Sequence, residues 1–280
     1  MIEIGLSTWS DHPGLGLKDK ATLSEYASQY PIVEVDSPYY AMPKLSDIVN
    51  WQHQVPSDFQ FILKATGKMT LHGLDNQEPY LNNERRLEFT NYRRVIDPLI
   101  RNQQLAAILF QFPARFNCRI ENIRYLLEIR QLLKKVPIAI EFRNHQWVSD
   151  TVGQDSMAYL KKLGFINVSV DEPFDGVVGM PQNLTITNPK LTILRLHGRN
   201  HDAWLHASQF SKKDRTSYSY SDEELQQIAK TVQAMAKKTK KVVVIFNNNG
   251  NHDAYPNAQK LKEILGLHFT GLNPMQLDLF

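Results

Sequence analysis

The sequence of 280 residues predicts an α/β protein that forms a single TIM-like (β/α)8 barrel. Three observations lead to this prediction. Eight short runs rich in β-branched and aromatic residues recur along the chain, and most are separated by segments with apolar residues at helical spacing. Strands that alternate with helices pair in parallel, and eight such units fit the roughly 250 residues typical of a closed barrel. The chain also lacks the GxGxxG and GxxxxGK patterns of open nucleotide-binding sheets.

The predicted elements follow one another at fairly regular intervals. The strands are expected at residues 2–7, 32–36, 59–64, 105–111, 138–142, 166–171, 191–197 and 242–247. Residues 122–134 and 222–237 have the clearest helical periodicity, and a long amphipathic helix is expected over about 83–101. The loops after strands three and seven, residues 66–104 and 198–220, are unusually long. Residues 172–190 are rich in Pro and Gly and predict no clear helix. We expect one barrel domain over residues 1–267 and a tail over 268–280.

Composition excludes several classes of protein. With 32 basic and 29 acidic side chains the net charge is only +3, which excludes a polycation. The longest apolar runs are far shorter than the roughly 18 residues that a membrane span needs. The start of the chain has no basic and apolar leader, so no secretory signal is visible. The single cysteine, Cys118, excludes an internal disulfide framework and a Cys-rich zinc site. We therefore expect a cytoplasmic protein with no membrane partner.

Alternation within the strands predicts where a site lies, because successive side chains point to opposite faces. One set is mostly polar and is expected to point into the barrel: Glu34, Asp36, Gln60, Lys64, Gln111, Glu141, Arg143, Ser169, Asp171, Arg195, His197 and Arg199. The complementary set is apolar and is expected to face the helices: Val33, Val35, Leu63, Phe110, Phe112, Ile140, Phe142, Val170, Leu194 and Leu196. Most of the polar set lies at the carboxyl ends of the strands, where barrel enzymes keep their sites.

These polar side chains suggest roles. We expect catalytic groups among Glu34, Glu141, Asp171, His197 and Lys64. Substrate-binding groups are expected at Asp36, Gln111, Arg143, Arg195 and Arg199, since the cations among them suit an anionic or polyhydroxyl ligand. The alternative is a buried network of ion pairs that closes the barrel without any function.

The loop after the last strand adds a candidate anion site. Asn247 and Asn248 precede Gly250 and a predicted helix start near residue 253. Barrels often bind phosphate between the loops after strands seven and eight, helped by a helix N-terminus. Gly198 and Arg199 would face this loop, although the same residues also suit a plain turn.

A metal and a carboxylate pair are two further possibilities. Zinc, manganese or magnesium could be held by Glu34, Asp36, Glu141, Asp171 and His197. No HxH or HExxH spacing is present and several cations share the space, so a divalent metal is possible but is not favoured. Glu34 and Glu141 could instead act as acid and base, as in glycoside hydrolysis.

Several separated motifs resemble one family. They are Gly5-Leu6-Ser7-Thr8-Trp9, Val33-Glu34-Val35-Asp36-Ser37-Pro38-Tyr39-Tyr40, Phe61-Ile62-Leu63-Lys64-Ala65, Leu109-Phe110-Gln111-Phe112-Pro113, Glu141-Phe142-Arg143-Asn144-His145-Gln146-Trp147, Arg195-Leu196-His197-Gly198-Arg199 and Phe246-Asn247-Asn248. In this order they resemble the YecE-like family, domain of unknown function number 72. The resemblance implies a TIM-like barrel, loosely similar to sugar isomerases, with no settled activity. Tyr40 and Trp147, which lie within these motifs, are also expected among the substrate-binding residues. Asp36 stands where the family pattern usually has Asn.

The end of the chain suggests a partner. Its last five residues resemble the pentapeptide with which bacterial replication and repair proteins dock on the DNA sliding clamp: Gln276, Leu277, Asp278, Leu279 and Phe280. The apolar members could fill a groove of the partner, or they could fold back onto their own domain. The loop 198–220 combines cations with aromatic residues in a mixture suited to stacking and phosphate contact: Trp204, Lys212, Lys213, Arg215, Tyr218 and Tyr220. The alternative is that these residues form an ordinary solvated surface.

The sequence thus leaves three hypotheses. The first is an enzyme, a hydrolase or isomerase with acid–base carboxylates, that acts on a phosphate-bearing or sugar-like substrate, possibly part of a nucleic acid. The second is a non-catalytic module that binds a small anion or nucleic acid and is recruited to the sliding clamp. The third is a metal-dependent sugar isomerase or phosphodiesterase, with the cofactor otherwise unknown.

Overall fold

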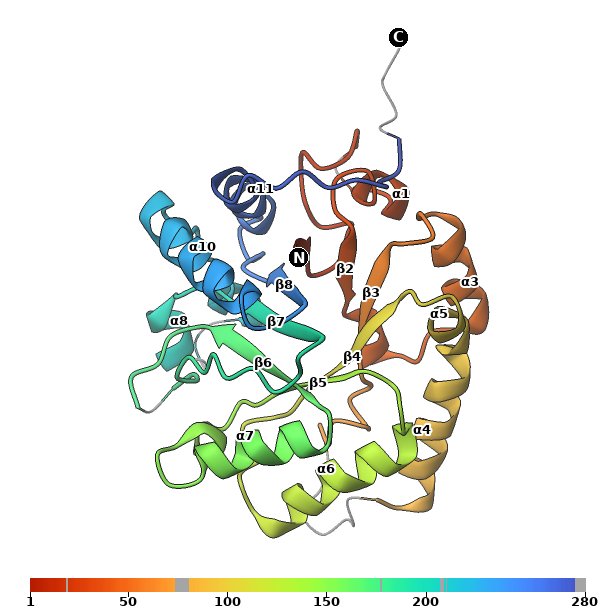
Figure 1. Cartoon of the computed structure of the whole chain (residues 1–280), viewed down its shortest axis with the longest axis vertical. Helices are drawn as coiled ribbons and strands as arrows, with labels where there is room; N and C mark the ends of the chain where they lie inside the picture. The colour runs from red at the N-terminus through yellow and green to blue at the C-terminus, as the bar shows by residue number, and fades with distance from the viewer. Residues whose placement is uncertain (19, 74–80, 177, 207–208, 210, 275–280) are drawn as a thin grey trace.

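The computed structural model describes residues 1–18, 20–73, 81–176, 178–206, 209 and 211–274. It contains eight strands, as predicted: β1 (Ile2–Leu6), β2 (Ile32–Val35), β3 (Gln60–Lys64), β4 (Leu105–Gln111), β5 (Ile138–Glu141), β6 (Ile166–Asp171), β7 (Leu191–Leu196) and β8 (Lys241–Phe246). The strands are parallel and follow the order β1-β8-β7-β6-β5-β4-β3-β2. They form the central barrel in Figure 1.

The barrel is nearly closed between its first two strands. A single parallel bridge joins Ser7 to Glu34, and the backbone N–H of Thr8 donates to the carbonyl of Glu34 at 2.8 Å. Gly5 makes this approach possible, because a Cβ at that position would lie 2.4 Å from the carbonyl oxygen of Ile32. The sequence prediction of a (β/α)8 barrel is confirmed.

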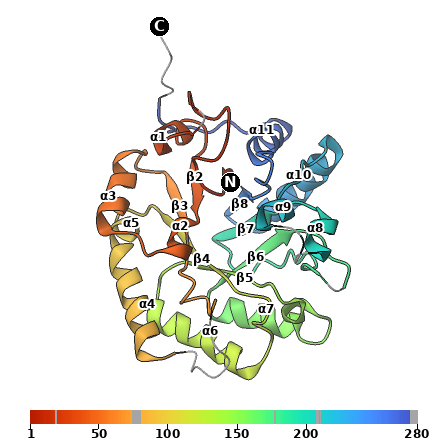
Figure 2. The same ribbon diagram turned by 180° about the vertical axis from the view of Figure 1, so that it is seen from behind.

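Helices surround the strands in both Figure 1 and the view from behind in Figure 2. The longer ones are α3 (Leu45–His53), α4 (Asn83–Val95), α6 (Ile120–Leu133), α7 (Gly153–Lys162), α10 (Asp222–Ala236) and α11 (Ala254–Ile264). The shorter ones are α1 (Leu23–Tyr26), α2 (Ser37–Tyr40), α5 (Asp97–Arg101), the 3-10 helix η1 (His145–Val148), α8 (His201–Leu205) and α9 (Lys212–Arg215). None of the described helices is long and apolar enough to span a bilayer.

The helix α10 shows why the sequence folds this way. Its first turn is fixed by a capping box between Ser221 and Glu224, and its buried residues include Leu225, Ile228 and Val232, which share one face at the spacing of an α-helix. That face packs on the apolar outer surface of the barrel, which belongs to one continuous core. Burying this face supplies most of the stability of such a helix, since isolated helices of this length are marginal in water.

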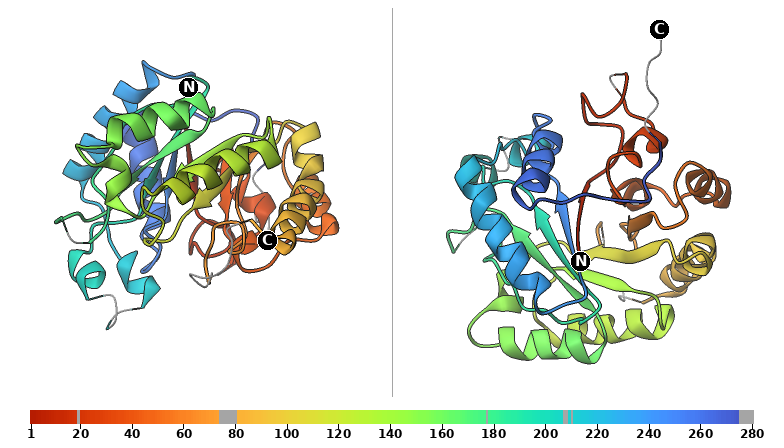
Figure 3. Two further views of the ribbon diagram at one scale, coloured as in Figure 1. Left: turned by 90° about the horizontal axis from the view of Figure 1, so that it is seen from below. Right: turned by 45° about the horizontal axis from the view of Figure 1, so that its top comes forward.

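Two regions depart from the regular pattern. Residues 172–176 and 178–190, the described part of the connection between β6 and β7, form no helix, in agreement with the Pro- and Gly-rich sequence there. The long connection after β7 instead holds α8 and α9. In the left view of Figure 3, the N-terminus lies at one end of the barrel and these two short helices lie at the other, beyond the carboxyl ends of the strands.

Candidate active site

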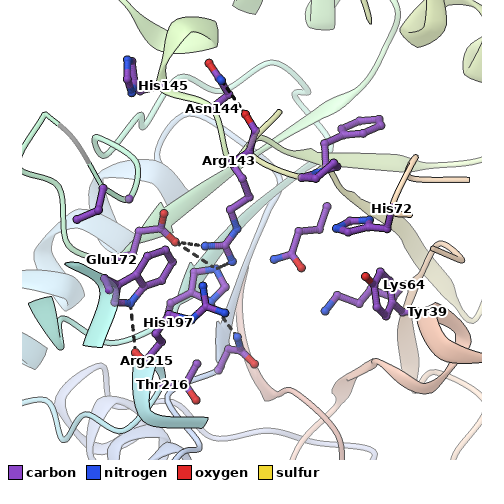
Figure 4. A pocket seen from close by; sticks show the side chains of 18 of the residues that line it. Tyr39, Lys64, His72, Arg143, Asn144, His145, Glu172, His197, Arg215 and Thr216 are labelled. Atoms are coloured by element: carbon purple, nitrogen blue, oxygen red, sulfur yellow. Dashed lines mark hydrogen bonds and ion pairs between the residues drawn. The ribbon is translucent and has the colours of Figure 1, made fainter. Parts of the chain in front are cut away.

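A cavity of about 670 Å³, called the main cavity below, opens at the carboxyl ends of the strands (Figure 4). Its lining comprises Tyr39, Tyr40, Lys64, His72, Gln111, Phe112, Pro113, Ala114, Arg143, Asn144, His145, Glu172, Val178, Gly179, His197, Trp204, Arg215, Thr216 and Asn247. Among these residues, three carry a fixed positive charge and a single one, Glu172, carries a carboxylate. The side chains that line the main cavity are therefore richer in cations than in carboxylates.

A fully buried guanidinium lies beneath the main cavity and binds two carboxylates. Arg195 from β7 donates to both carboxylate oxygens of Glu34, from Nε at 2.8 Å and from Nη2 at 2.5 Å. Its Nη1 donates to Glu141 of β5. All three side chains are inaccessible to solvent. The bidentate geometry fixes the planes of these groups and compensates the carboxylate charges that burial alone would make costly.

A second guanidinium connects this buried trio to the main cavity. Nη2 of Arg143 lies 2.8 Å from Oε1 of Glu141, and its Nη1 donates to Oε2 of Glu172 at 2.5 Å. Burial disfavours ionisation of Glu141, but the cations Arg195 and Arg143 hold the pKa of its carboxyl well below the ordinary value. Glu141 is therefore an anion that anchors two arginines, which leaves it poorly suited to transfer protons.

Glu172 has the opposite character. Its side chain is solvent-inaccessible, and Oε1 has no hydrogen-bond partner among the described residues. Burial raises the pKa of Glu172 to about 7; Arg143 opposes this shift, whereas the neighbouring Glu141 and Asp171 add to it. A carboxyl group with a pKa near neutrality can both give and take a proton at physiological pH.

His197 lies between these groups and is neutral. Its Nε2 is 3.3 Å from Oε1 of Glu141 and 3.2 Å from Nη2 of Arg143, while its Nδ1 is 2.8 Å from the side-chain amide nitrogen of Asn247. Burial and then the positive charge of Arg143 lower the pKa of His197 to about 3. His197 can therefore orient neighbouring groups or hydrogen-bond a ligand, but it carries no charge at neutral pH.

The other side of the main cavity holds Lys64 with Tyr39 and His72 (Figure 4). Nζ of Lys64 lies 3.2 Å from Asp36 and 5.6 Å from the centre of the Tyr39 ring. Burial would raise the pKa of Asp36, but Lys64 and then Arg195 keep it below the ordinary value. Nε2 of Gln111 donates to Glu141 at 2.5 Å, so the predicted polar residues at the carboxyl ends of β2 to β5 and on β7 do meet. Gln60, at the start of β3, does not join them: its amide donates to the carbonyls of Asp58 and Gln103.

The prediction for the sixth strand was wrong. Val170 pairs beside Arg195, and Asp171 pairs beside Leu196. Residues paired in this way share a face, so Val170 points inward and Asp171 points outward. The reason lies in residues 183–187, which cover this strand in place of a helix: Oγ of Ser169 donates to the carbonyl of Asn183 at 2.7 Å. The outer face of β6 is therefore polar. The carboxylate that points inward is Glu172, one residue after Asp171.

Asp171 and Arg199 belong to a separate cluster outside the main cavity. Arg199 donates to both carboxylate oxygens of Asp171, at 2.8 and 2.7 Å, and to Glu224 of α10 at 2.8 Å. The hydroxyl of Tyr220 donates to Asp171 at 2.9 Å. These contacts tie the ends of β6 and β7 to the start of α10. The structure thus gives Asp171 and Arg199 positions that do not reach a ligand in the main cavity.

Two other expected ligand contacts are also packed elsewhere. Trp147 stacks on Phe142 with ring centres 4.3 Å apart, and its indole N–H donates to the carbonyl of Phe116. The amide of Asn248 donates to the carbonyl of Tyr218 and to the side chain of Asn257. Neither Trp147 nor Asn248 lines the main cavity. The expected phosphate cradle opposite Gly198 is thus filled by contacts within the protein.

The insertion after β7 contributes more than the strand pattern indicated. Trp204 and Arg215 line the main cavity, and the guanidiniums of Arg143 and Arg215 lie 5.3 and 5.5 Å from the Trp204 ring. Tyr40, which the sequence did propose, lines the opposite rim and is 77% exposed. For Trp204 and Arg215, the mixture of cations and aromatics in residues 198–220 was the sequence feature that indicated a ligand contact.

The donor set gives little support to a metal. Within the described ranges, no group of three or more His, Cys, Asp or Glu residues is placed to hold a metal ion. The space between Glu34 and Glu141 is taken by Arg195, whose charge already compensates theirs. The clamp-like pentapeptide at 276–280 lies outside the described residues.

Comparison with known proteins identifies related chains. The sequence model of the family described as "Protein of unknown function DUF72" matches residues 3–278. The UPF0759 protein YunF of Bacillus subtilis is 34% identical over 285 residues, covering 100% of both chains. A DUF72 family protein from Enterococcus faecalis has a crystal structure with a TM-score of 0.92 at 37% identity, covering 99% of this chain and 100% of that one. A D-psicose 3-epimerase from Clostridium cellulolyticum, solved with D-tagatose, shares only the fold, with a TM-score of 0.52 at 10% identity over 94% of this chain and 97% of that one.

Proposed function

The chain belongs to the DUF72 family, and from the geometry of its main cavity we propose that it is an enzyme that performs acid–base chemistry on a phosphate-bearing, sugar-like substrate. The observation that carries this proposal is the environment of Glu172. Its carboxyl lines a cation-rich cavity, has one oxygen without a partner among the described residues, and has a pKa of about 7. These are the properties of a general acid or base that acts near neutral pH.

Three of the sequence-predicted groups, Glu34, Glu141 and Arg195, support Glu172 in this proposal. Glu34 and Glu141 hold Arg195, and Glu141 together with Glu172 holds Arg143. Both arginines are thereby fixed before any substrate arrives. Such preorganised positive charge stabilises negative charge that develops during a reaction, because no reorganisation is then needed.

Three cations on different elements provide for an anionic substrate group. Lys64 ends β3, Arg143 follows β5 and Arg215 ends α9, and all three line the main cavity. Arginine binds phosphate or carboxylate through two parallel hydrogen bonds. The exposed ring of Tyr40 and the ring of Trp204 offer flat surfaces on which a sugar can pack. The epimerase supports only the barrel, so the choice of sugar chemistry rests on these contacts.

The test compares Glu172→Gln with Glu263→Gln, which changes an exposed glutamate of α11. A panel of hexose and pentose phosphates is incubated with each protein in D2O and followed by ¹H and ³¹P NMR for new products and for exchange of carbon-bound hydrogen. We expect turnover by the wild type and by Glu263→Gln, with a loss of roughly 100-fold or more in Glu172→Gln. Undiminished turnover in Glu172→Gln would contradict the acid–base assignment.

A further inference from the structure

A second depression, called the side groove below, adjoins the main cavity over the same end of the barrel. It has a volume of about 260 Å³ and is lined by Ser7, Thr8, Asp11, Asp36, Lys213, Thr216, Asn247, Asn249 and Gly250. Thr216 and Asn247 line both spaces, so the two adjoin at these residues. Together they exceed what a single phosphorylated monosaccharide fills, because pockets of several hundred Å³ suit drug-sized ligands.

A polar atom of the side groove is buried without a partner. Oγ1 of Thr8 is shielded from solvent and has no hydrogen-bond partner among the described residues. A buried polar atom left in this state costs free energy in the isolated protein. Thr8 lines the side groove. A ligand that donates a hydrogen bond to this hydroxyl oxygen would remove the cost.

Thr8 is also held in a strained backbone conformation. Its φ is +63°, in the left-handed region that β-branched residues rarely adopt. The conformation is enforced from two sides: the Thr8 N–H donates to the carbonyl of Glu34, and Nε2 of the buried His12 lies 3.3 Å from the carbonyl oxygen of Thr8. Strain that the surroundings impose in this way is typical of ligand-binding positions.

The two spaces differ in chemistry. The main cavity has Lys64, Arg143 and Arg215 against one carboxylate, whereas the side groove offers hydroxyls, amides and the carboxylates of Asp11 and Asp36 against the single cation Lys213 among its lining residues. Short hydroxyl and amide side chains that both donate and accept are suited to the hydroxyls of an uncharged sugar.

We propose that the side groove binds an uncharged sugar unit joined to the phosphate-bearing unit in the main cavity, so that the ligand is a disaccharide phosphate or a compound of the same two-part chemistry. For the phosphate-bearing unit of the ligand, this inference rests on the proposed function. The junction between the two units lies at Asn247 and Thr216, the residues that both spaces share. Thr8 contributes an acceptor for a hydroxyl of the uncharged unit.

Equilibrium binding tests the inference without any need for turnover. Glucose 6-phosphate is compared by calorimetry with trehalose 6-phosphate, sucrose 6-phosphate and maltose 6′-phosphate, which add one uncharged sugar to a glucose 6-phosphate unit. We expect at least one disaccharide phosphate to bind about tenfold more tightly than glucose 6-phosphate. Equal or weaker binding of all three would overturn the two-part ligand while leaving the proposed function in place. If glucose 6-phosphate and all three disaccharides fail to bind, the anionic half, and with it the proposed function, is wrong.

Variants at Thr8 test whether the tighter binding of a disaccharide phosphate, relative to glucose 6-phosphate, comes from the side groove. Thr8→Val keeps the branched shape and lacks the hydroxyl, so the tenfold gain should disappear, whereas Thr8→Ser should retain it. Binding of glucose 6-phosphate should stay unchanged in both. Thr90→Val, on the exposed side of α4, serves as the control. Because Thr8 Oγ1 has no partner in the protein, Thr8→Val should not lower the melting temperature. A disaccharide gain that persists in Thr8→Val would contradict the assignment.

Discussion

Replacing Arg195 by Gln tests whether the ion network beneath the main cavity holds the barrel mouth together. The substitution removes both hydrogen bonds to Glu34, whereas Glu141 keeps contacts with Arg143 at 2.8 Å and with Gln111 at 2.5 Å. The damage therefore falls on Glu34, a fully buried carboxyl group. Burial raises the pKa of Glu34 to about 7 against the opposing charge of Arg195, so loss of the guanidinium raises it further. Breaking a buried pair by removing one partner costs about 3–5 kcal/mol, a large share of the 5–15 kcal/mol that stabilises a typical domain.

A double-mutant cycle with Glu34→Gln separates this loss from simple repacking. In the double variant Glu34→Gln/Arg195→Gln, no buried carboxyl group without its guanidinium remains on β2. The double variant should therefore lose about 2–3 kcal/mol less free energy of unfolding than the sum of the losses in the two single variants. Urea unfolding at pH 7, followed by tryptophan fluorescence and circular dichroism, measures each free energy. Arg94→Gln on the exposed side of α4 should change it by less than about 0.5 kcal/mol. The reasoning would be refuted if the losses in free energy of unfolding of the two single variants added up in the double variant, or if Arg195→Gln lost less than about 1 kcal/mol.

Three further outcomes are expected. Burial raises the pKa of Glu172 from 4.5 to about 7, so its contribution to stability is full below pH 4.5 and is lost as the pH rises through 7. Glu172→Gln should therefore unfold at a higher urea concentration than the wild type at pH 8 but not at pH 4.5, and equal shifts at both values would contradict this. Gly250→Ala should lower the free energy of unfolding in urea by about 1–3 kcal/mol, because its Cβ would lie 2.1 Å from Oγ of Ser217. An unchanged unfolding midpoint would show that the Ser217 side chain moves aside at little cost. Removing residues 276–280 should abolish capture by an immobilised bacterial sliding clamp, while persistent capture would exclude the tail as the docking segment.

The strands could be predicted because their signal is local. Buried parallel strands are short β-branched runs, and the predicted ranges 105–111 and 166–171 coincide with β4 and β6. The inward position of Glu34, Glu141 and Arg195 also follows from alternation, since apolar helices cover the outer faces of their strands. For these strands the period of two is sufficient to locate the ionisable ends.

Glu172 could not be found in this way, because alternation identifies the inward face only where the outer face is apolar. On β6 the outer cover is the polar segment 183–187, which offers backbone carbonyls to Asn167 and Ser169. The positions of Trp204 and Arg215 depend on a different kind of information. The indole N–H of Trp204 donates to the carbonyl of Arg215 at 3.2 Å, a contact between two short helices that no strand period encodes.

The titration of the Glu172 carboxyl tests the central claim most directly. Protein labelled with ¹³C at the glutamate carboxyl carbon is followed by NMR across the pH range, and the Glu172 signal is assigned by its absence in Glu172→Gln. We predict an inflection at about pH 7. An inflection near the ordinary value of 4.5 would show that this carboxylate is a plain ion-pair partner of Arg143 and would remove the acid–base site from the main cavity.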